Sequence, residues 1–252
     1  MSAAMEKARF KDVSCLAHTL QIVIKDSVFN QKEVSNVITI CRRLVGHFKH
    51  SVKANKQLKA ARETFHMPQK CMIQDEPTRW NSTLHMLQRV LEQRRPLALV
   101  NPGLDRTNGI HLTPSQWSLI EAISEILSLF ENATLAISNV GETIPIINSI
   151  TTSLKENYTL KDMTNDFLAS LQRRFGNCES DQCYATATIL DPRFKTKVFV
   201  SNEAVIAAKQ HILSEMDKLE TSKISALSGE MESSNAANFT VSSNSSTNFY
   251  SN

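Results

Sequence analysis

Basic side chains are concentrated between residues 42 and 70, and they are the part of this sequence best suited to a binding task. The stretch holds eight lysines and arginines and a single acid, Glu63. The eight are Arg42, Arg43, Lys49, Lys53, Lys56, Lys59, Arg62 and Lys70. Cations in such density attract a polyanion, and contacts to phosphates hold DNA without reading its bases. The stretch therefore predicts weak, phosphate-mediated DNA binding, although a merely solvated helix face explains the pattern equally well.

Arg79 and Trp80 form a second candidate for contact with nucleic acid. An exposed tryptophan beside an arginine can stack on an unpaired base, a contact worth on the order of 1 to 3 kcal/mol. Tryptophan more often anchors its own helix to the core. The sequence leaves both interpretations open.

Cys15 and His18 have the spacing of half a zinc site. A closed zinc site needs four converging ligands. The pairs His47/His50 and Cys178/Cys183 do not complete such a set. We therefore expect no bound metal and no other cofactor, with Cys15 as a small buried side chain and His18 as a core or cleft histidine.

The sequence also contains no nucleophile elbow, phosphate loop or dinucleotide fingerprint, so we expect no small-molecule substrate. No run approaches the roughly 20 apolar residues of a membrane-spanning helix, and the first residues lack the apolar core of a secretory signal. We expect no membrane partner and a nuclear location. Five cysteines are too few for a disulfide scaffold, and we expect reduced thiols.

Charge and turn-forming residues indicate how the chain is organised. Residues 1–100 carry a net charge of +9, and residues 101–252 carry a net charge of −6. Only 6 glycines and 7 prolines occur among 252 residues, which is too few for a fold of many short strands. The chain should be mainly helical.

Helix signals position the basic residues. Asn30 and Glu33 can form a capping box, and apolar residues then recur at three- and four-residue steps, which predicts one amphipathic helix as far as about Phe65. A second helix should begin near Trp80 and end at Pro96. A surface loop is expected over 101–109.

Further helices are expected along the second half. Thr113, Pro114 and Gln116 have the pattern of a capping box with proline at the first helical position. Helices should also span 143–158, 163–175, 183–190 and 202–219. From residue 228 the chain holds 8 serines and 5 asparagines among 25 residues, so we expect a disordered tail over 228–252.

Three short motifs resemble successive motifs of hAT-superfamily transposases. They are CLAHTLQIVIKD at 15–26, TRWNST at 78–83 and YATATILDPRFK at 184–195. Their order and spacing also match, and the sequence is most similar to the zinc finger BED domain-containing proteins over most of residues 1–220.

This resemblance implies an RNase H-like (α/β) catalytic domain interrupted by a helical insertion. The expected parts are a catalytic-domain remnant at 1–30, a basic helix and an Arg-Trp helix at 31–100, a helical insertion domain at 101–227, and the tail. In the family, the positions of Cys15 and His18 line the cleft. The positions of Arg79 and Trp80 help hold a flipped base.

The family cuts DNA with two aspartates and a glutamate that hold divalent metal. The resemblance places the aspartates before Ser2 and the glutamate after residue 220, together with the C-terminal dimerisation region. The BED finger would also precede this sequence. We therefore expect a catalytically inactive nuclear protein that binds DNA, a protein partner or a second copy, and that serves in transcriptional regulation. The alternatives are part of an active cut-and-paste transposase with an incomplete gene model, or a purely helical protein-interaction scaffold.

Overall fold

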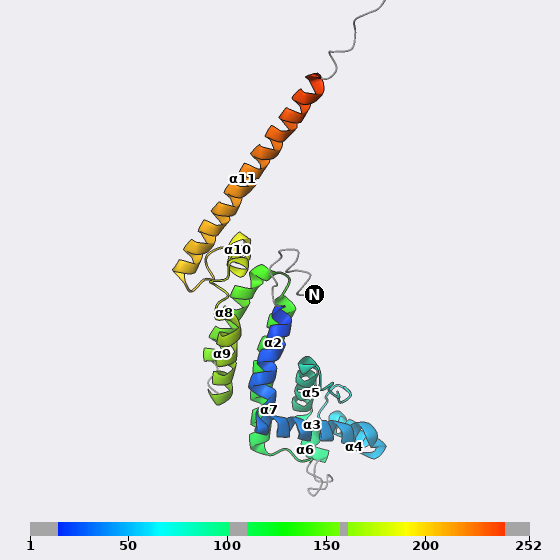
Figure 1. Ribbon diagram of the computed structural model, residues 1–252. Coiled ribbons are helices and arrows are strands. Elements are labelled where there is room, and N and C mark those ends of the chain that lie inside the picture. The colour runs from blue at the N-terminus through cyan, green and yellow to red at the C-terminus, as the bar shows by residue number, and fades with distance from the viewer. Residues whose placement is uncertain (1–14, 101–109, 157–160, 240–252) are drawn as a thin grey trace, which may run out of the picture.

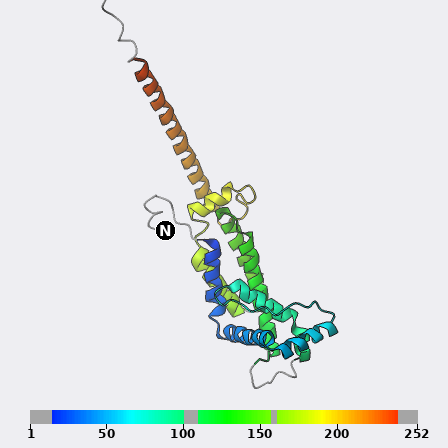
Figure 2. The ribbon, with the colours of Figure 1, turned by 90° about the vertical axis from the view of Figure 1, so that its right-hand side faces the viewer.

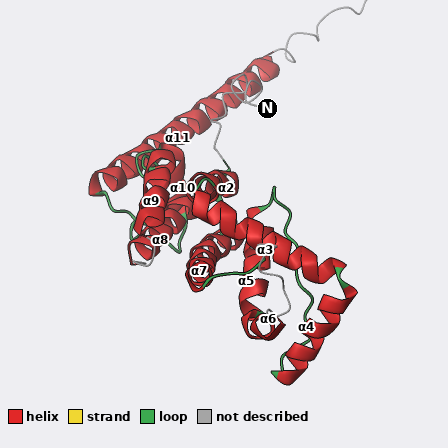
Figure 3. Ribbon diagram, turned by 90° about the horizontal axis from the view of Figure 1, so that it is seen from below, coloured by secondary structure: helices red, strands yellow, loops and turns green. Residues whose placement is uncertain are grey.

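Helices make up all the regular structure in the part of the chain that the structure describes (Figure 3). The computed structural model describes residues 15–100, 110–156 and 161–239. The elements are α2 (Leu16–Ile24), the π-helix η1 (Lys25–Phe29), α3 (Lys32–His50), α4 (Val52–Thr64), α5 (Trp80–Glu92), α6 (Arg94–Val100), α7 (Pro114–Ala136), the short 3-10 helix η4 (Val140–Glu142), α8 (Thr143–Glu156), α9 (Lys161–Phe175), α10 (Gln182–Leu190) and α11 (Asn202–Phe239). The predicted mainly helical fold is confirmed.

The expected α/β character is not found in these ranges. The described part of the 1–30 remnant is the helix α2 followed by η1, and no strand occurs among the described residues. The apolar run from Leu16 packs on α7 and α9 instead of joining a sheet. The short pieces expected before residue 15 and the loop 101–109 lie outside the described residues.

The predicted basic helix is two helices. It was expected to start at an Asn30 cap, but Asn30 ends η1, and the N-cap of α3 is Gln31, whose side chain makes no capping bond. Ser51 then interrupts the helix with an extended backbone, and its hydroxyl accepts a hydrogen bond from the Ala54 N–H at 3.2 Å. Serine caps helices well, so a new helix starts where the apolar repeat alone suggested continuity.

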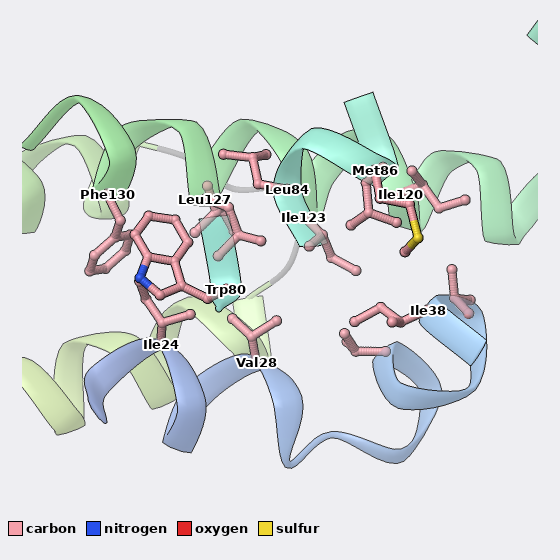
Figure 4. Packing of buried hydrophobic residues seen from close by; sticks show 14 of the residues in the cluster. Ile24, Val28, Ile38, Trp80, Leu84, Met86, Ile120, Ile123, Leu127 and Phe130 are labelled. Atoms are coloured by element: carbon pink, nitrogen blue, oxygen red, sulfur yellow. The ribbon is translucent and has the colours of Figure 1, made fainter. Parts of the chain in front are cut away.

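One hydrophobic core runs through the described chain from α2 to α9, and Figure 4 shows the part of it where α2, α3, α5 and α7 meet. α7 contacts α5, α2, α3 and α8, and its Ile123, Leu127 and Phe130 are buried. Its predicted capping box is present, because Thr113 Oγ1 accepts from the Gln116 N–H and Gln116 Oε1 accepts from the Thr113 N–H. A well-capped central helix gives the surrounding helices a fixed surface to pack on.

Pro96 does not end the helical segment as expected. It occupies the third position of α6, in the first turn, where the missing N–H has no helical partner to lose. α6 packs on α4 and so closes the end of the molecule that carries the basic helices.

A charged cluster fixes α10 against the turn before α8. Glu142 is buried, and its carboxylate accepts hydrogen bonds from the Ser138 backbone and hydroxyl and from Arg193 Nη2 at 2.7 Å. Arg193 also pairs with Asp191, one residue before Pro192. Gly141 packs so closely on α10 that a Cβ would lie 2.8 Å from the Ala187 carbonyl oxygen. Residues of the third motif, 184–195, therefore stabilise the packing of α10 on the turn before α8.

α11 leaves the body as a single long helix (Figures 1 and 2). It extends to Phe239, so the expected tail from Ser228 is helical as far as that residue; residues 240–252 lie outside the described residues. No proline follows Pro192, and Glu230, Met231 and Ala236 have good helix propensity, which outweighs the serines and asparagines. No helix in the described ranges is long and apolar enough to cross a membrane.

Replacing Glu142 tests the α10 junction through its pH dependence. Hydrogen bonds from Ser138, opposed in part by burial and supported by Arg193, lower the pKa of Glu142 from 4.5 to about 2. The carboxylate therefore stabilises the fold above pH 4.5, and this contribution is lost as the pH falls toward 2. Glu142→Gln should lower the free energy of unfolding at neutral pH by roughly 1 to 2 kcal/mol.

Denaturant unfolding followed by circular dichroism across that pH window provides the measurement. The variant should lose less stability on acidification than the wild type. Glu125→Gln, at an exposed position of α7, is the matched control and should leave both quantities unchanged. Equal acid sensitivity of Glu142→Gln and wild type would show that this carboxylate does not carry the effect.

Candidate nucleic-acid interface

Five of the predicted DNA-contacting side chains are exposed along α3 and α4, and we call them the basic ridge. They are Arg43, Lys49, Lys53, Lys56 and Lys59. On α4, Ala54, Leu58 and Ala61 are buried, so the lysines occupy the opposite, solvent-facing side. No member of the ridge forms an ion pair with another described residue. The ridge can therefore offer its full charge to an anion.

Arg42 was predicted as a phosphate contact, but its guanidinium is already bound. Its Nε donates to both oxygens of Asp75 at 3.0 Å, and its Nη2 donates to Oδ2 at 2.7 Å. The Asp75 side chain has no exposed surface. Burial by itself raises the pKa of Asp75, but hydrogen bonds from Arg42 and Thr83 and the charge of Arg42 lower it below its usual value. Arg42 is thus a structural residue.

Arg62 was also predicted to contact DNA, but this prediction is wrong, because the residue is buried and only 1% exposed. Its Nε donates to Gln93 Oε1 at 2.6 Å, and burial lowers the pKa of the guanidinium. Lys70 is exposed but pairs with Glu92 at 2.5 Å. The apolar stem of Arg62 packs in the interior, and the hydrogen bond to Gln93 partly satisfies the guanidinium that is buried with it. These two positions add little to the external field.

Trp80 belongs to the core, while its neighbour Arg79 is exposed. Figure 4 shows the indole among Ile24, Val28 and Leu127, and the whole residue is only 8% exposed. Trp80 therefore anchors the first turn of α5 to the core. Of the two interpretations of this residue, the structure supports the core anchor, and Arg79 alone remains available to a phosphate.

A cavity of about 480 Å³ lies beside this tryptophan. The π-helix η1 supplies Lys25 and Phe29 to its wall, α2 supplies Gln21, and the second motif supplies Thr78 and Trp80. Sequence reasoning did not single out Gln21, Lys25 or Thr78 as neighbours. A π-helical turn has no recognised sequence signal, although such turns are frequent at functional sites.

Cys15 and His18 do not lie in a buried cleft. Both are exposed, Cys15 as the N-cap residue of α2 and His18 on its first turn. This corrects the expectation of a buried cysteine and a core histidine, whereas the cleft position that the family resemblance implies for both residues stays a prediction. Within the described ranges, no three histidine, cysteine or acidic side chains are grouped as metal ligands would be. Neither residue lines the cavity beside Trp80.

The chain is similar to one family model and to several zinc finger BED domain-containing proteins. The family model described as ZBED1 RNase-like helical domain matches residues 13–126. Zinc finger BED domain-containing protein 6 from Mus musculus is 31% identical over 230 residues, which cover 84% of this chain and 23% of that protein. The Homo sapiens protein of that name is 31% identical over 211 residues, with 77% and 21% covered. Zinc finger BED domain-containing protein 4 from Homo sapiens is 24% identical over 221 residues, with 84% and 19% covered. The chain thus spans about a fifth of the length of these relatives.

A double-mutant cycle tests the structural role of Arg42. Arg42→Met leaves a buried carboxylate without its cation and should lower the free energy of unfolding by about 3 to 5 kcal/mol. Asp75→Asn should also destabilise, and the double variant should cost clearly less than the sum, with a coupling of at least about 1 kcal/mol. Denaturant unfolding supplies all four values.

Arg43→Met is the matched control, because Arg43 is adjacent and exposed and forms no ion pair with another described residue. It should change the free energy of unfolding by no more than about 0.5 kcal/mol. Strict additivity of the Arg42 and Asp75 changes would contradict the role assigned to the pair.

Proposed function

Because this chain is like the zinc finger BED domain-containing proteins over most of its length, as its three motifs predicted, we propose that it is a domesticated hAT-derived protein that binds DNA. The contact is made by the basic ridge, which meets the phosphate backbone. The observation that carries this proposal is the exposure, on two consecutive helices, of five cations that form no ion pair with another described residue. Each phosphate that they neutralise releases counterions, so binding is weak, sequence-tolerant and sensitive to salt.

The proposed function is binding without strand cleavage. Metal-dependent cutting needs carboxylates that are free to hold divalent ions. Several partly or fully enclosed acids of the described chain are bound to cations instead: Asp75 to Arg42, Glu142 and Asp191 to Arg193, and Asp26 to Arg174. These engagements support a structural rather than a catalytic role for the acids. In this proposal the protein is nuclear and takes part in transcriptional regulation.

Two other functions remain to be distinguished by experiment. In the first, the chain is part of an active cut-and-paste transposase and its own acids assist cleavage. In the second, the helices serve only as a protein-interaction scaffold and the basic ridge is solvated without a ligand. The first predicts metal-dependent nicking, and the second predicts no salt-dependent affinity for DNA.

Removing charge from the basic ridge should weaken DNA binding and flatten its salt dependence. We expect the triple variant Lys53→Gln, Lys56→Gln, Lys59→Gln to lower affinity for a DNA duplex by at least about tenfold at low salt. The slope of log affinity against log salt should fall by about 2 to 3, because each lost phosphate contact contributes about 0.9. Fluorescence anisotropy at several salt concentrations measures both.

The control removes three other exposed lysines, Lys155, Lys161 and Lys197, which lie outside α3 and α4. This variant has the same net charge as the test variant, so it separates local contact from overall charge. It should keep most of the wild-type slope. A wild-type slope near zero, or equal losses in the two variants, would reject the basic ridge as the DNA contact.

The absence of cleavage is tested directly with supercoiled plasmid. With magnesium or manganese, the purified chain should convert no more plasmid to the nicked form than a mock preparation does. Nicking by the wild type that disappears in Asp26→Asn or Glu179→Gln would instead support the transposase alternative. Both variants should be checked for helical content before the comparison.

A further inference from the structure

The buried guanidinium of Arg62 has no ionic partner among the described residues. Its Nε donates to Gln93 Oε1 at 2.6 Å, but Gln93 is a neutral residue. Its Nη2 is also buried and forms no hydrogen bond with any described residue. A buried charge is costly unless it is both paired and hydrogen-bonded, so this arginine needs an explanation that the surrounding side chains do not supply.

Gln93 leaves a second donor unsatisfied at the same place. It is fully buried where α5 ends, and its Nε2 has no hydrogen-bond partner among the described residues. An amide has one acceptor atom and one donor atom whichever way it is turned, so it can match only one of the two N–H groups on a guanidinium edge. The Arg62 Nη2 and the Gln93 Nε2 are therefore two unpaired donors that lie close together.

Arg42 shows what such an edge normally binds in this fold. Its Nε and Nη2, the same two atoms, donate to the two carboxylate oxygens of Asp75. A carboxylate satisfies both donors and neutralises the charge at the same time. At Arg62 an amide stands where Arg42 has a carboxylate, so one acceptor and one negative charge are missing from the contact.

The charges around Arg62 favour an anion over a water molecule. Burial lowers the pKa of Arg62, and the charge of Arg89 lowers it further, although Cys71 and Glu92 act in the opposite direction. Glu92 is already shared, because it pairs with Lys70 at 2.5 Å and with Arg89 at 2.9 Å. Three cations thus depend on one carboxylate. A water molecule would accept the hydrogen bonds but would not balance this excess of positive charge.

The position of the two donors limits the size of the anion. Both nitrogen atoms are buried, so a phosphate or an organic acid could reach them only by displacing side chains. The anion must also act purely as an acceptor, because Nη2 and Nε2 only donate. A monatomic halide meets both requirements and carries a single negative charge.

We propose that Arg62 Nη2 and Gln93 Nε2 together bind one halide ion, with chloride as the ligand, between α4 and the junction of α5 with α6. The ion neutralises the buried guanidinium and accepts a hydrogen bond from each side chain. It thereby fixes the buried side of α4 to the end of α5. The site lies inside the fold and does not depend on DNA binding by the basic ridge.

Chloride should therefore stabilise the chain more than gluconate, an anion too large for this site. Urea unfolding followed by circular dichroism, at constant ionic strength and over a series of chloride-to-gluconate ratios, measures the difference. When chloride is at ten times the dissociation constant of the site, the equilibrium constant for folding should be about elevenfold higher than in gluconate alone. A wild-type chain that is equally stable in the two salts would overturn the proposal.

Replacing the amide by a carboxylate should make the ion unnecessary. In Gln93→Glu the new carboxylate can accept from both Nε and Nη2 of Arg62, as Asp75 does from Arg42. Its folding constant should change by less than about twofold between the two salts. Gln57→Glu makes the same chemical change at an exposed position of α4 and should keep the full chloride effect. Equal chloride dependence of Gln93→Glu and wild type would reject the site.

Chloride nuclear magnetic resonance tests binding to the folded chain directly. Exchange with a protein site broadens the chloride signal, and added bromide should reverse this broadening by competition. Gln93→Met has nearly the same size and no donor, so it should remove most of the bromide-sensitive broadening, and it provides the test if Gln93→Glu does not fold. Circular dichroism should show wild-type helical content in Gln93→Met. Broadening that persists unchanged in this folded variant would refute the assignment to Arg62 and Gln93.

Discussion

The carboxylate of Asp75 is the point on which the basic half of the molecule depends. It has no exposed surface, and a buried carboxylate is tolerated only when it is paired and hydrogen-bonded. Arg42 of α3 and Thr83 of α5 satisfy it together, so one side chain joins α3, the segment before α5 and α5 itself. The same contact determines where the basic ridge begins. Because Arg42 is occupied, the freely exposed charge starts at Arg43 and continues along α4.

Local signals in the sequence predicted the helices well and the charges less well. The capping box at Thr113 was correct because all its parts lie within four residues. The break at Ser51 was missed because the apolar repeat continues across it, and only the capping bond to Ala54 reveals it. Arg42 and Arg62 were assigned to the surface because their partners, Asp75 and Gln93, are about thirty residues away and have no pattern that links them.

The three sequence motifs lie at two separate places in the structure. The first two meet at the cavity beside Trp80, where Lys25 and Gln21 of one motif face Thr78 of the other. The third motif lies elsewhere, at the junction of η4 and α10, where Arg193 pairs with Glu142 and Asp191. Motif spacing suggested the family but could not show this separation. The exposure of Cys15 and His18 could not be predicted either, because it depends on which side of α2 packs on the rest of the fold.

The basic ridge occupies one end of the molecule, because α3 and α4 lie at the end away from α11 (Figures 1 and 2). Its five cations are spread over two consecutive helices, so each of them adds separately to the attraction for a chain of phosphates. Arg42 and Arg193 cannot add to this attraction in the same way, because buried carboxylates hold them in place. The fold thus divides its cations into those that stabilise it and those that remain available to an anion.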